Sequence, residues 1–339
     1  MIDARPPIPA PTVLAYGSRS AAKRVSKMPF RIPEVLLDTT IYLYPDEVSA
    51  EAGQHIGGSG FIAGVPLKDS TFHTLWAVTN KHIIDDGYLT IRLNKKDGGI
   101  VCIDTIEDEW HVHPDGDDLA IRPLAVPHIA KFNFVPLDMM LTQSAARALD
   151  IGPGDEAFVI GRFVSREGTQ KNAPTVRFGR IAQSADEQVK YDSYLQMAWL
   201  VEIMSLNGFS GSPVFCALDS YYSRNVENQS KSKGTLDPFF EGKNFNYNIP
   251  LLSHGNFPTG PFLLGIDCCM IRLWSKVCDA SRREMSHGHQ VELNTGMMGV
   301  IPSWRLVDLL ENNSARAEVE ASAVLEAQAR GEASASGGA

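Results

Sequence analysis

The apolar residues of this chain fall in short runs that end at glycine, proline or polar turn formers. The stretches Leu36–Tyr44, Phe61–Val65 and Phe72–Thr79 are rich in β-branched and aromatic residues, as strands are. The second half continues in the same way at Glu156–Phe163 and Leu195–Met204. Further runs of this kind are 88–93, 99–103, 119–122, 175–183, 214–218, 262–271 and 297–301. Many short strands joined by glycine turns are typical of barrels or sandwiches, so the sequence predicts an all-β protein.

The strand-like runs form two groups, which we interpret as two β domains. The first group spans residues 36–130 and the second spans residues 131–312. A proline-dotted passage from Pro123 to Pro136 lies between them and is typical of a linker rather than of a helix. A helix is predicted only near the end of the second group, where Ser303 is the expected N-cap.

Three further segments show no strand periodicity. Residues 1–35 are rich in proline, alanine, serine and basic side chains, and we expect a flexible arm. Residues 219–261 form a long polar insertion in the second domain, and loops of that length are usually functional or disordered. Residues 313–339 form a low-complexity tail rich in alanine, glutamate and serine. We expect any regulatory partner to bind through the insertion or the N-terminal arm.

The composition narrows the class of protein. The 339 residues are 44% hydrophobic and 21% charged, which is typical of a soluble globular protein. A formal net charge of −9 disfavours binding to nucleic acid. No apolar run approaches the roughly 18–20 residues that span a bilayer, and the N-terminus lacks the apolar region of a secretory signal. We therefore expect a cytoplasmic protein that binds neither nucleic acid nor membrane.

The cysteines and histidines do not predict a disulfide framework or a metal centre. The five cysteines are an odd number at low density, which favours reduced thiols: Cys102, Cys216, Cys268, Cys269 and Cys278. The two H-x-H pairs, at 111/113 and 287/289, lack further ligands at the spacing that zinc requires. We expect no metal and no cofactor.

A serine lies between two glycines in the stretch Gly208-Phe209-Ser210-Gly211, and Pro213 then begins an apolar run. Glycine tolerates backbone angles that other residues avoid, so the chain turns sharply here and exposes a hydroxyl. The N–H groups of Gly208 and Ser210 lie beside that hydroxyl, and two such donors next to a nucleophile form an oxyanion hole. The alternative is an ordinary Gly/Ser turn.

A serine hydroxyl needs a base within hydrogen-bond reach and a group that orients the base. His82 is the best candidate for the base because it follows an apolar strand. Asp118 is the best candidate for the orienting acid, since it directly precedes the strand-like run 119–122; Asp115 and Asp117 fit less well. Considered singly, His82 is better explained as an exposed turn histidine, and Asp118 is equally well explained as a turn aspartate.

Together the three segments resemble the sequence blocks of trypsin-like serine peptidases. These blocks are VTNKH at Val78–His82, DLAI at Asp118–Ile121 and GFSGSP at Gly208–Pro213, in the chain order His, Asp, Ser. Shorter matches to the bacterial trypsin-like and HtrA-type branch are GSGFI (58–62), EAFVIGRF (156–163), LLGI (263–266) and GVIPS (299–303). The resemblance covers roughly residues 36–311, and no PDZ-like extension follows the terminal helix.

The resemblance implies a chymotrypsin-like fold of two six-stranded antiparallel β-barrels with a C-terminal helix. It also implies a serine endopeptidase that acts on protein or peptide substrates. Ser210 would be the nucleophile, His82 the general base, and Asp118 the acid that orients it. Gly208 and Ser210 would supply the oxyanion hole.

Two residues near the serine depart from the digestive trypsins. Those enzymes carry an aspartate just before the nucleophile, which pairs with a newly cleaved N-terminus, and here the position is Phe209. We therefore expect activity without N-terminal trimming. Ser212 replaces the second glycine after the nucleophile, which should leave the chemistry intact.

The resemblance also places the substrate pocket. Met204 stands where the floor is expected and is not an acid, which argues against cleavage after lysine or arginine. Cys268, Cys269 and Met270 would form the edge that pairs with the substrate backbone. We predict small or medium apolar P1 residues; the alternative is that Met204 and Met270 are core residues.

Two other functions compete with this interpretation. An α/β-hydrolase would need G-x-S-x-G and alternating helices, and position 212 is serine. The other alternative is a catalytically latent protease-fold module that binds or signals through its cleft and the insertion.

Overall fold

A computed structural model describes the chain at residues 31–67, 72–163, 168, 170–191, 194–204, 208–218, 252–254, 257–278, 281–283, 290–317 and 319–321. Residues Pro33–Ala339 form one unit, separate from Met1–Ile32. Nearly all of the expected N-terminal arm, most of the insertion 219–261 and the end of the expected tail lie outside the described residues.

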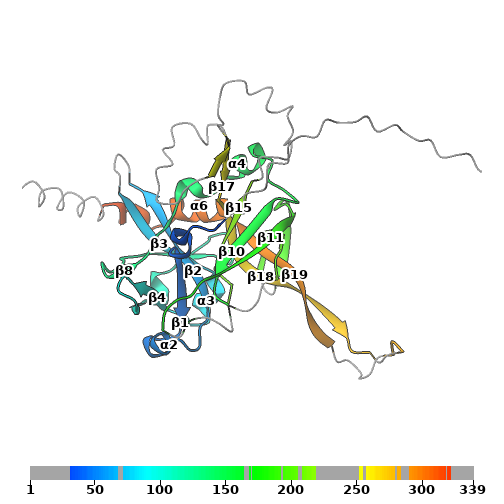
Figure 1. The fold of residues 1–339 in the computed structure, drawn as a ribbon, viewed down its shortest axis with the longest axis horizontal. Helices are drawn as coiled ribbons and strands as arrows, with labels where there is room; N and C mark the ends of the chain where they lie inside the picture. The colour runs from blue at the N-terminus through cyan, green and yellow to red at the C-terminus, as the bar shows by residue number, and fades with distance from the viewer. Residues whose placement is uncertain are drawn as a thin grey trace, which may run out of the picture. The chain divides into compact units, whose positions relative to one another are not determined.

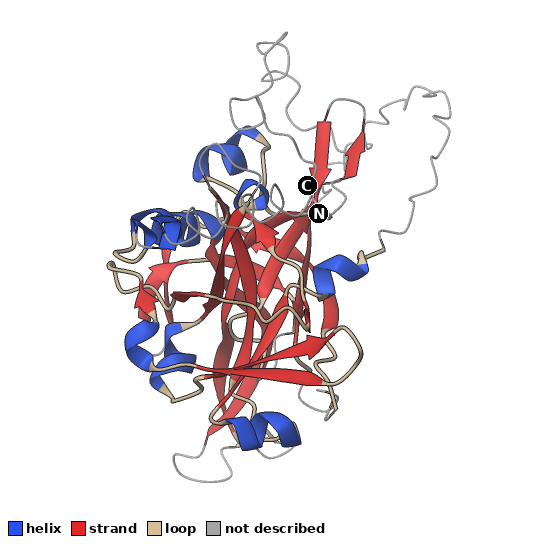
Figure 2. Cartoon of the chain, turned by 90° about the vertical axis from the view of Figure 1, so that its left-hand side faces the viewer, coloured by secondary structure: helices blue, strands red, loops and turns tan. Residues whose placement is uncertain are grey.

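Strands make up the body of the fold, and the short helices lie around them (Figure 2). The described helices are α1 (Glu34–Leu37), α2 (Glu47–Ala52), α3 (Lys81–Asp85), η1 (Glu107–Glu109), η2 (Leu137–Met139), α4 (Gln143–Ala148) and α6 (Ser303–Asn312). None of the helices in the described residues is both long and apolar enough to cross a bilayer.

The first half of the chain folds into one mainly antiparallel sheet with nine strands. Its longer strands are β1 (Thr40–Tyr44), β2 (Gly58–Pro66), β3 (His73–Thr79), β4 (Thr90–Lys95), β5 (Ile100–Asp104) and β7 (Ala120–Pro123). Three strands of two residues complete it: β6 (His111–Val112), β8 (Ala130–Lys131) and β9 (Val135–Pro136). The order is β5-β4-β1-β2-β3-β7-β6, with β8 on β4 and β9 on β2.

The passage Pro123–Pro136 therefore does more than link the two halves. It contributes β8 and β9 to the first sheet, and β9 is the parallel neighbour of β2. Proline is tolerated at such short edge segments because they need few ladder hydrogen bonds.

The second half forms a closed six-stranded barrel. Its strands are β10 (Glu156–Gly161), β11 (Thr175–Gln183), β14 (Trp199–Glu202), β15 (Pro213–Ala217), β18 (Phe262–Lys276) and β19 (Gln290–Pro302), in the order β10-β11-β14-β19-β18-β15. The hairpins β12 (Gln188–Tyr191) with β13 (Tyr194–Met197), and β16 (Leu252–His254) with β17 (Phe257–Gly260), stand outside the barrel. The all-β class, the closed barrel and the terminal helix confirm the expected fold class.

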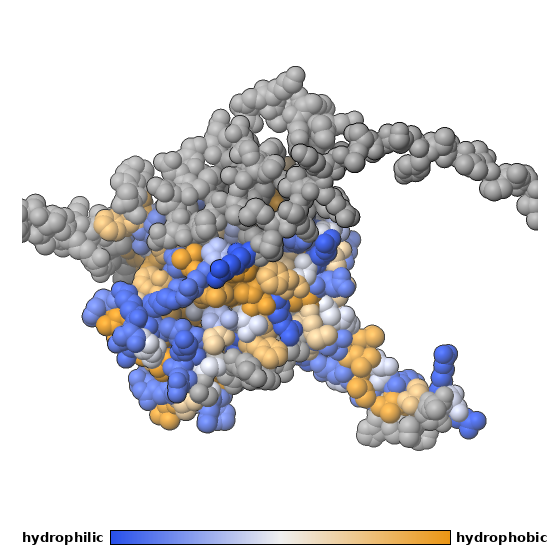
Figure 3. Space-filling view, in the orientation of Figure 1, coloured by the Kyte–Doolittle hydropathy of each residue, from blue (hydrophilic) through white to orange (hydrophobic). Residues whose placement is uncertain are grey.

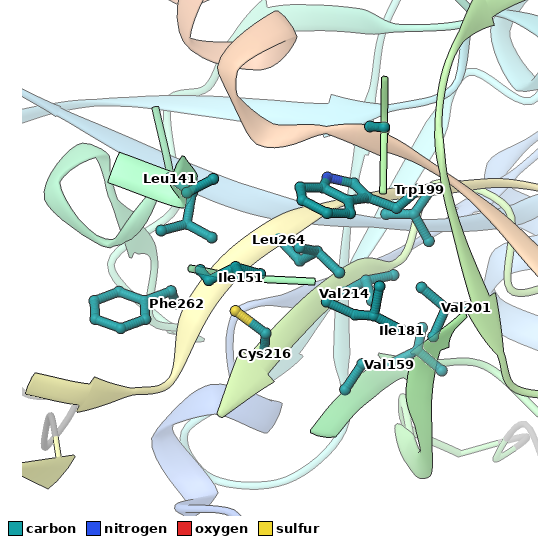
Figure 4. Close-up of a cluster of buried hydrophobic side chains, with 14 of the residues drawn as sticks. Leu141, Ile151, Val159, Ile181, Trp199, Val201, Val214, Cys216, Phe262 and Leu264 are labelled. Carbon is teal, nitrogen blue, oxygen red and sulfur yellow. The ribbon is translucent and has the colours of Figure 1, made fainter. Parts of the chain in front are cut away.

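Alternation along the strands fills this barrel. Successive side chains of a strand point to opposite faces, so Val159 points into the core while Phe158 packs outside against the ring of Phe215, 5.2 Å away. Figure 4 shows Val159, Val214 and Leu264 converging from three different strands. The closed, apolar interior gives the loops at the barrel ends rigid attachment points.

The strands β18 and β19 continue past the barrel as a two-stranded ribbon, which Figure 1 shows in yellow and orange. The two strands remain antiparallel partners from the pair of Gly265 with Pro302 to the pair of Lys276 with Gln290. The outer part exposes the apolar side chains Leu273, Trp274, Val291 and Leu293. Figure 3 shows orange, hydrophobic residues along this ribbon.

The N-cap prediction for Ser303 was wrong. Pro302 occupies the N-cap position of α6, and Ser303 is the first helical residue. The Ser303 hydroxyl instead donates a hydrogen bond to the Leu141 carbonyl, 2.7 Å away, and is fully buried. The Ser303 hydroxyl, which the sequence pattern predicts as a helix cap, therefore makes a tertiary contact instead.

Candidate active site

His82 lies on α3, directly after the strand β3. Asn80 is the N-cap of this short helix, so a rigid strand end determines where the imidazole lies. The His82 side chain is 31% exposed, which leaves part of the ring accessible.

Asp118 holds His82 through two hydrogen bonds. Its Oδ2 lies 2.7 Å from His82 Nδ1, and its Oδ1 accepts the His82 backbone N–H at 2.9 Å. Asp118 is 1% exposed, and its own carbonyl accepts a hydrogen bond from Asn80 Nδ2 at 2.8 Å. Because the carboxylate is an acceptor, Nδ1 carries the proton and Nε2 keeps its lone pair.

The pKa of His82 is raised above its ordinary value. Burial of the ring lowers the pKa, but the hydrogen bond and charge of Asp118 act in the opposite direction and outweigh it, with smaller contributions from Asp86 and Asp267. Negative charges near an imidazole favour its protonated form. The base is therefore more basic than an isolated histidine.

The hairpin β12–β13 also reaches Asp118. Gln196 is 2% exposed and its Oε1 accepts the Asp118 N–H at 2.7 Å. Burial raises the pKa of Tyr194, as do the charge of Asp118 and a hydrogen bond to its carboxylate. Tyr194 and Gln196 are two positions apart, so they share one face of β13. Sequence reasoning missed both, since neither lies near Asp118 in the chain.

Asp115 and Asp117 belong to a separate cluster with Arg305 of α6. Arg305 Nε donates to Asp117 Oδ2 at 2.5 Å, and Nη2 donates to Asp115 Oδ2 at 2.8 Å. His113 lies in the same cluster, where burial and the Arg305 charge lower its pKa. These ion pairs connect the loop that carries Asp118 to the terminal helix.

Ser210 lies on a tight loop that directly precedes β15. Gly208 and Gly211 have φ values of +97° and +83°, which glycine adopts at little cost. A Cβ on Gly211 would lie 2.1 Å from the Ser59 carbonyl oxygen, so only glycine fits there. Phe209 is fully buried in the barrel core, whereas Ser210 is half-buried.

The Ser210 loop meets the His82 helix at Gly58. A Cβ on Gly58 would lie 2.7 Å from Ile83 Cδ1 and 3.1 Å from the Ser210 carbonyl oxygen. Asp267 makes a second connection: its backbone bonds to Gly211 and Ser212, and its charge acts on His82.

No hydrogen bond joins the Ser210 hydroxyl to His82 among the described residues. Such bonds are often long in unliganded sites and shorten when substrate binds.

The expected pocket residues differ in exposure. Met204 is 57% exposed, and its carbonyl accepts a hydrogen bond from Arg177. Cys268 and Cys269 are nearly fully buried, with sulfurs 3.4 Å apart, and Met270 is half-buried on the same strand. The hydrogen bond to Cys269 and burial raise the pKa of the Cys268 thiol, so it stays protonated at neutral pH.

One side of β18 lacks a strand partner near the serine. Its pairing with β15 ends at Ile266–Pro213, while its pairing with β19 continues. Residues 269 and 270 thus pair with β19 on one side, and the opposite side of residues 268–270 has no strand neighbour in the described chain. Within those same described residues, no three His, Cys, Asp or Glu side chains are arranged to hold a metal ion.

Comparison with known proteins gives distant structural similarities. No protein-family model matches the sequence, and no curated protein matches it significantly. The fold is similar to the MamO protease domain from Magnetospirillum magneticum, with 16% identity and a TM-score of 0.44 over 82% of this chain and 98% of that one. It is similar to Deg5, with 20% identity and a TM-score of 0.36 over 56% and 77%.

A third similar structure is an inactive form of Rv3671c from M. tuberculosis, with 12% identity and a TM-score of 0.37 over 81% of this chain and 86% of that one. We base the fold class on the strand order itself. The closed antiparallel barrel, the preceding sheet and the terminal helix form a chymotrypsin-like architecture.

Proposed function

We propose that the protein is a serine endopeptidase in which Ser210, His82 and Asp118 form the catalytic triad. The observation that carries the proposal is the doubly hydrogen-bonded His82–Asp118 pair beside a glycine-flanked loop with a half-buried serine. An exposed turn histidine and a turn aspartate would not explain why a buried carboxylate binds both Nδ1 and the backbone N–H of His82.

The chemistry follows from the tautomer of His82. Ser210 Oγ attacks the carbonyl carbon of the scissile peptide bond while Nε2 of His82 takes the hydroxyl proton. Asp118 stabilises the resulting imidazolium. His82 then gives the proton to the leaving amine, the C–N bond breaks, and Ser210 retains the acyl group. Water repeats the attack, which releases the acid and regenerates the serine.

The N–H groups of Gly208 and Ser210 would bind the oxyanion of the tetrahedral intermediate. Neither of them donates a hydrogen bond to another group in the described part of the chain. A preorganised donor of this kind contributes about 3–4 kcal/mol to the transition state. Phe209 is anchored in the core, so the loop has no need of a newly cleaved N-terminus.

Covalent labelling tests the function. A fluorophosphonate should label the folded wild-type protein at Ser210 at pH 8. Ser210→Ala should abolish labelling, and His82→Ala should slow it by about 10³-fold or more, because the base is lost. Ser303→Ala is a control with another buried serine and should label normally. A folded wild-type protein that is not labelled would instead identify a latent, protease-fold binding module.

For the substrate, we propose peptides with small or medium apolar P1 residues. The exposed Met204 offers no charge to bind lysine or arginine. Residues 268–270 have no β15 partner, and an extended peptide would pair with them on that side. Profiling with a peptide library should show cleavage after alanine, valine or leucine. Dominant cleavage after lysine, arginine or glutamate would overturn this specificity.

We also propose where in the cell the protein acts and which of its segments bind a regulatory partner. The odd number of cysteines at low density favours a cytoplasmic enzyme with reduced thiols. The arm and residues 219–261 are the segments where we expect a regulatory partner.

A further inference from the structure

Ser59 of β2 belongs to the first sheet, yet its polar groups bind the serine loop of the second half. Its hydroxyl donates a hydrogen bond to the Gly208 carbonyl at 2.9 Å. Its N–H donates to the Ser210 carbonyl, also at 2.9 Å. Its own carbonyl accepts a hydrogen bond from the Thr79 hydroxyl at 2.8 Å, and the residue is fully buried. Every polar group of Ser59 therefore has a partner.

Gly208 and Ser210 are the same two residues whose N–H groups would form the oxyanion hole. Ser59 binds the carbonyl of each of them, on the protein side of the loop. A peptide group is planar, so these two bonds hold the peptides Gly208–Phe209 and Ser210–Gly211. They flank the peptide Phe209–Ser210, which carries the Ser210 N–H and whose carbonyl accepts the Ser212 N–H at 2.8 Å. The N–H groups of Gly208 and Ser210 have no hydrogen-bond partner in the described chain.

Arg162 limits the remaining freedom of Gly208. Its backbone N–H donates to the Ser59 hydroxyl at 3.1 Å, so that hydroxyl both donates and accepts. Its guanidinium donates to the Ile56 carbonyl at 2.9 Å and packs over Gly208, where a Cβ would lie 3.1 Å from Nη1. Gly208, which has no side chain to restrain it, is thus held from two sides.

We propose that Ser59 is a positioning residue that holds the oxyanion loop in its active conformation. The inference rests on the proposed function, which it deepens: the buried Ser59 replaces a charged N-terminus as the group that sets the loop. It follows that the first sheet, through one hydroxyl, determines whether the second half can stabilise a transition state.

The test compares Ser59→Ala with Ser303→Ala. Both serines are fully buried, and both hydroxyls donate to the carbonyl of a distant segment. The Ser59 hydroxyl also accepts the Arg162 N–H, so Ser59→Ala loses one hydrogen bond more than Ser303→Ala. Ser59→Ala should lower kcat about tenfold or more with little change in KM, because oxyanion donors act in the transition state. Ser303→Ala should leave kcat near the wild-type value. The pH midpoint of activity should stay unchanged in both, since His82 and Asp118 are untouched.

Binding of a peptide aldehyde gives a readout independent of turnover. Its hemiacetal with Ser210 places an oxygen in the oxyanion hole, so its affinity should fall by the same factor as kcat/KM in Ser59→Ala. Ser59→Cys keeps the side-chain volume but supplies only a weak donor, and should give an intermediate loss.

Three results would overturn the inference. These are a Ser59→Ala variant with the kinetics of Ser303→Ala, an unchanged aldehyde affinity, or a wild-type kcat in Ser59→Cys if the alanine variant does not fold. A wild-type protein that does not react with the fluorophosphonate would overturn the proposed function itself, which separates the two failures.

Discussion

The imidazole of His82 is held along one edge only. Asp118 binds Nδ1 and the backbone N–H, while Nε2 has no hydrogen-bond partner among the described residues. That arrangement leaves the lone pair of Nε2 available as a base. Asp267, 1% exposed, adds a second negative charge near the ring. The residues around His82 thus determine both its tautomer and its pKa.

The pH dependence of activity tests the charge of Asp267. This charge raises the pKa of His82, so Asp267→Asn should lower that pKa. The active form is the neutral imidazole, and a lower pKa keeps it neutral at lower pH. The acidic limb of the kcat/KM profile should therefore move to lower pH in the variant, as measured by initial rates from pH 5 to 9.

Asp86→Asn is the matched control for this shift. Asp86 also raises the pKa of His82 but is exposed to solvent. Salt screens exposed charges and affects buried ones far less. The shift in Asp86→Asn should vanish at 1 M salt while that of Asp267→Asn persists. A midpoint that stays in place or rises in Asp267→Asn contradicts the assignment.

At the scale of elements, two segments of the second half reach the loop that carries Asp118. The hairpin β12–β13 contacts Asp118 itself through Gln196 and Tyr194. The helix α6 contacts the neighbouring Asp117 through Arg305. The loop is short and polar, so these contacts, rather than a core of its own, hold the acid in position.

Replacing Arg305 tests the contribution of the terminal helix. Arg305→Gln leaves Asp117, which is 5% exposed, without its charged partner. Loss of a partly buried, charge-assisted hydrogen bond should lower the free energy of unfolding by about 1–3 kcal/mol. Urea unfolding followed by circular dichroism measures this.

Arg316→Gln provides the comparison. Arg316 pairs with Glu320 one helical turn away, with both side chains partly exposed. Such a pair is worth about 0.3–0.5 kcal/mol. If Arg305→Gln destabilises the protein no more than Arg316→Gln does, the helix does not hold the acid loop.

For the whole molecule, the decisive contacts join the two halves of the chain. His82 lies on α3 and Asp118 on the loop before β7, both in the first half, while Ser210 belongs to the second half. Ser59, which belongs to the first sheet, and Asp267, which belongs to the barrel, both bind the serine loop. The site therefore exists only when the sheet and the barrel are packed together, and a stable fragment of either half would lack it.

Sequence reasoning reached His82, Asp118 and Ser210 because each lies in a local pattern of recognisable form. A strand leads to His82, a strand follows Asp118, and glycines flank Ser210. Gln196, Arg305 and Ser59 were beyond that reasoning. Their bonds to Asp118, Asp117 and Gly208 span 78, 188 and 149 residues, and a contact of that separation leaves no local pattern.

By itself, the sequence determined the all-β class, the closed-barrel strands and the sharp turn at Gly208–Gly211. Those features depend on alternation, β-branching and the backbone freedom of glycine, which act over a few neighbouring residues. Only the tertiary structure decided that the first sheet contains three extra short strands, that Ser303 bonds to Leu141 instead of capping α6, and that Ser59 holds Gly208. A buried polar group must find a partner somewhere, and packing alone chooses which one.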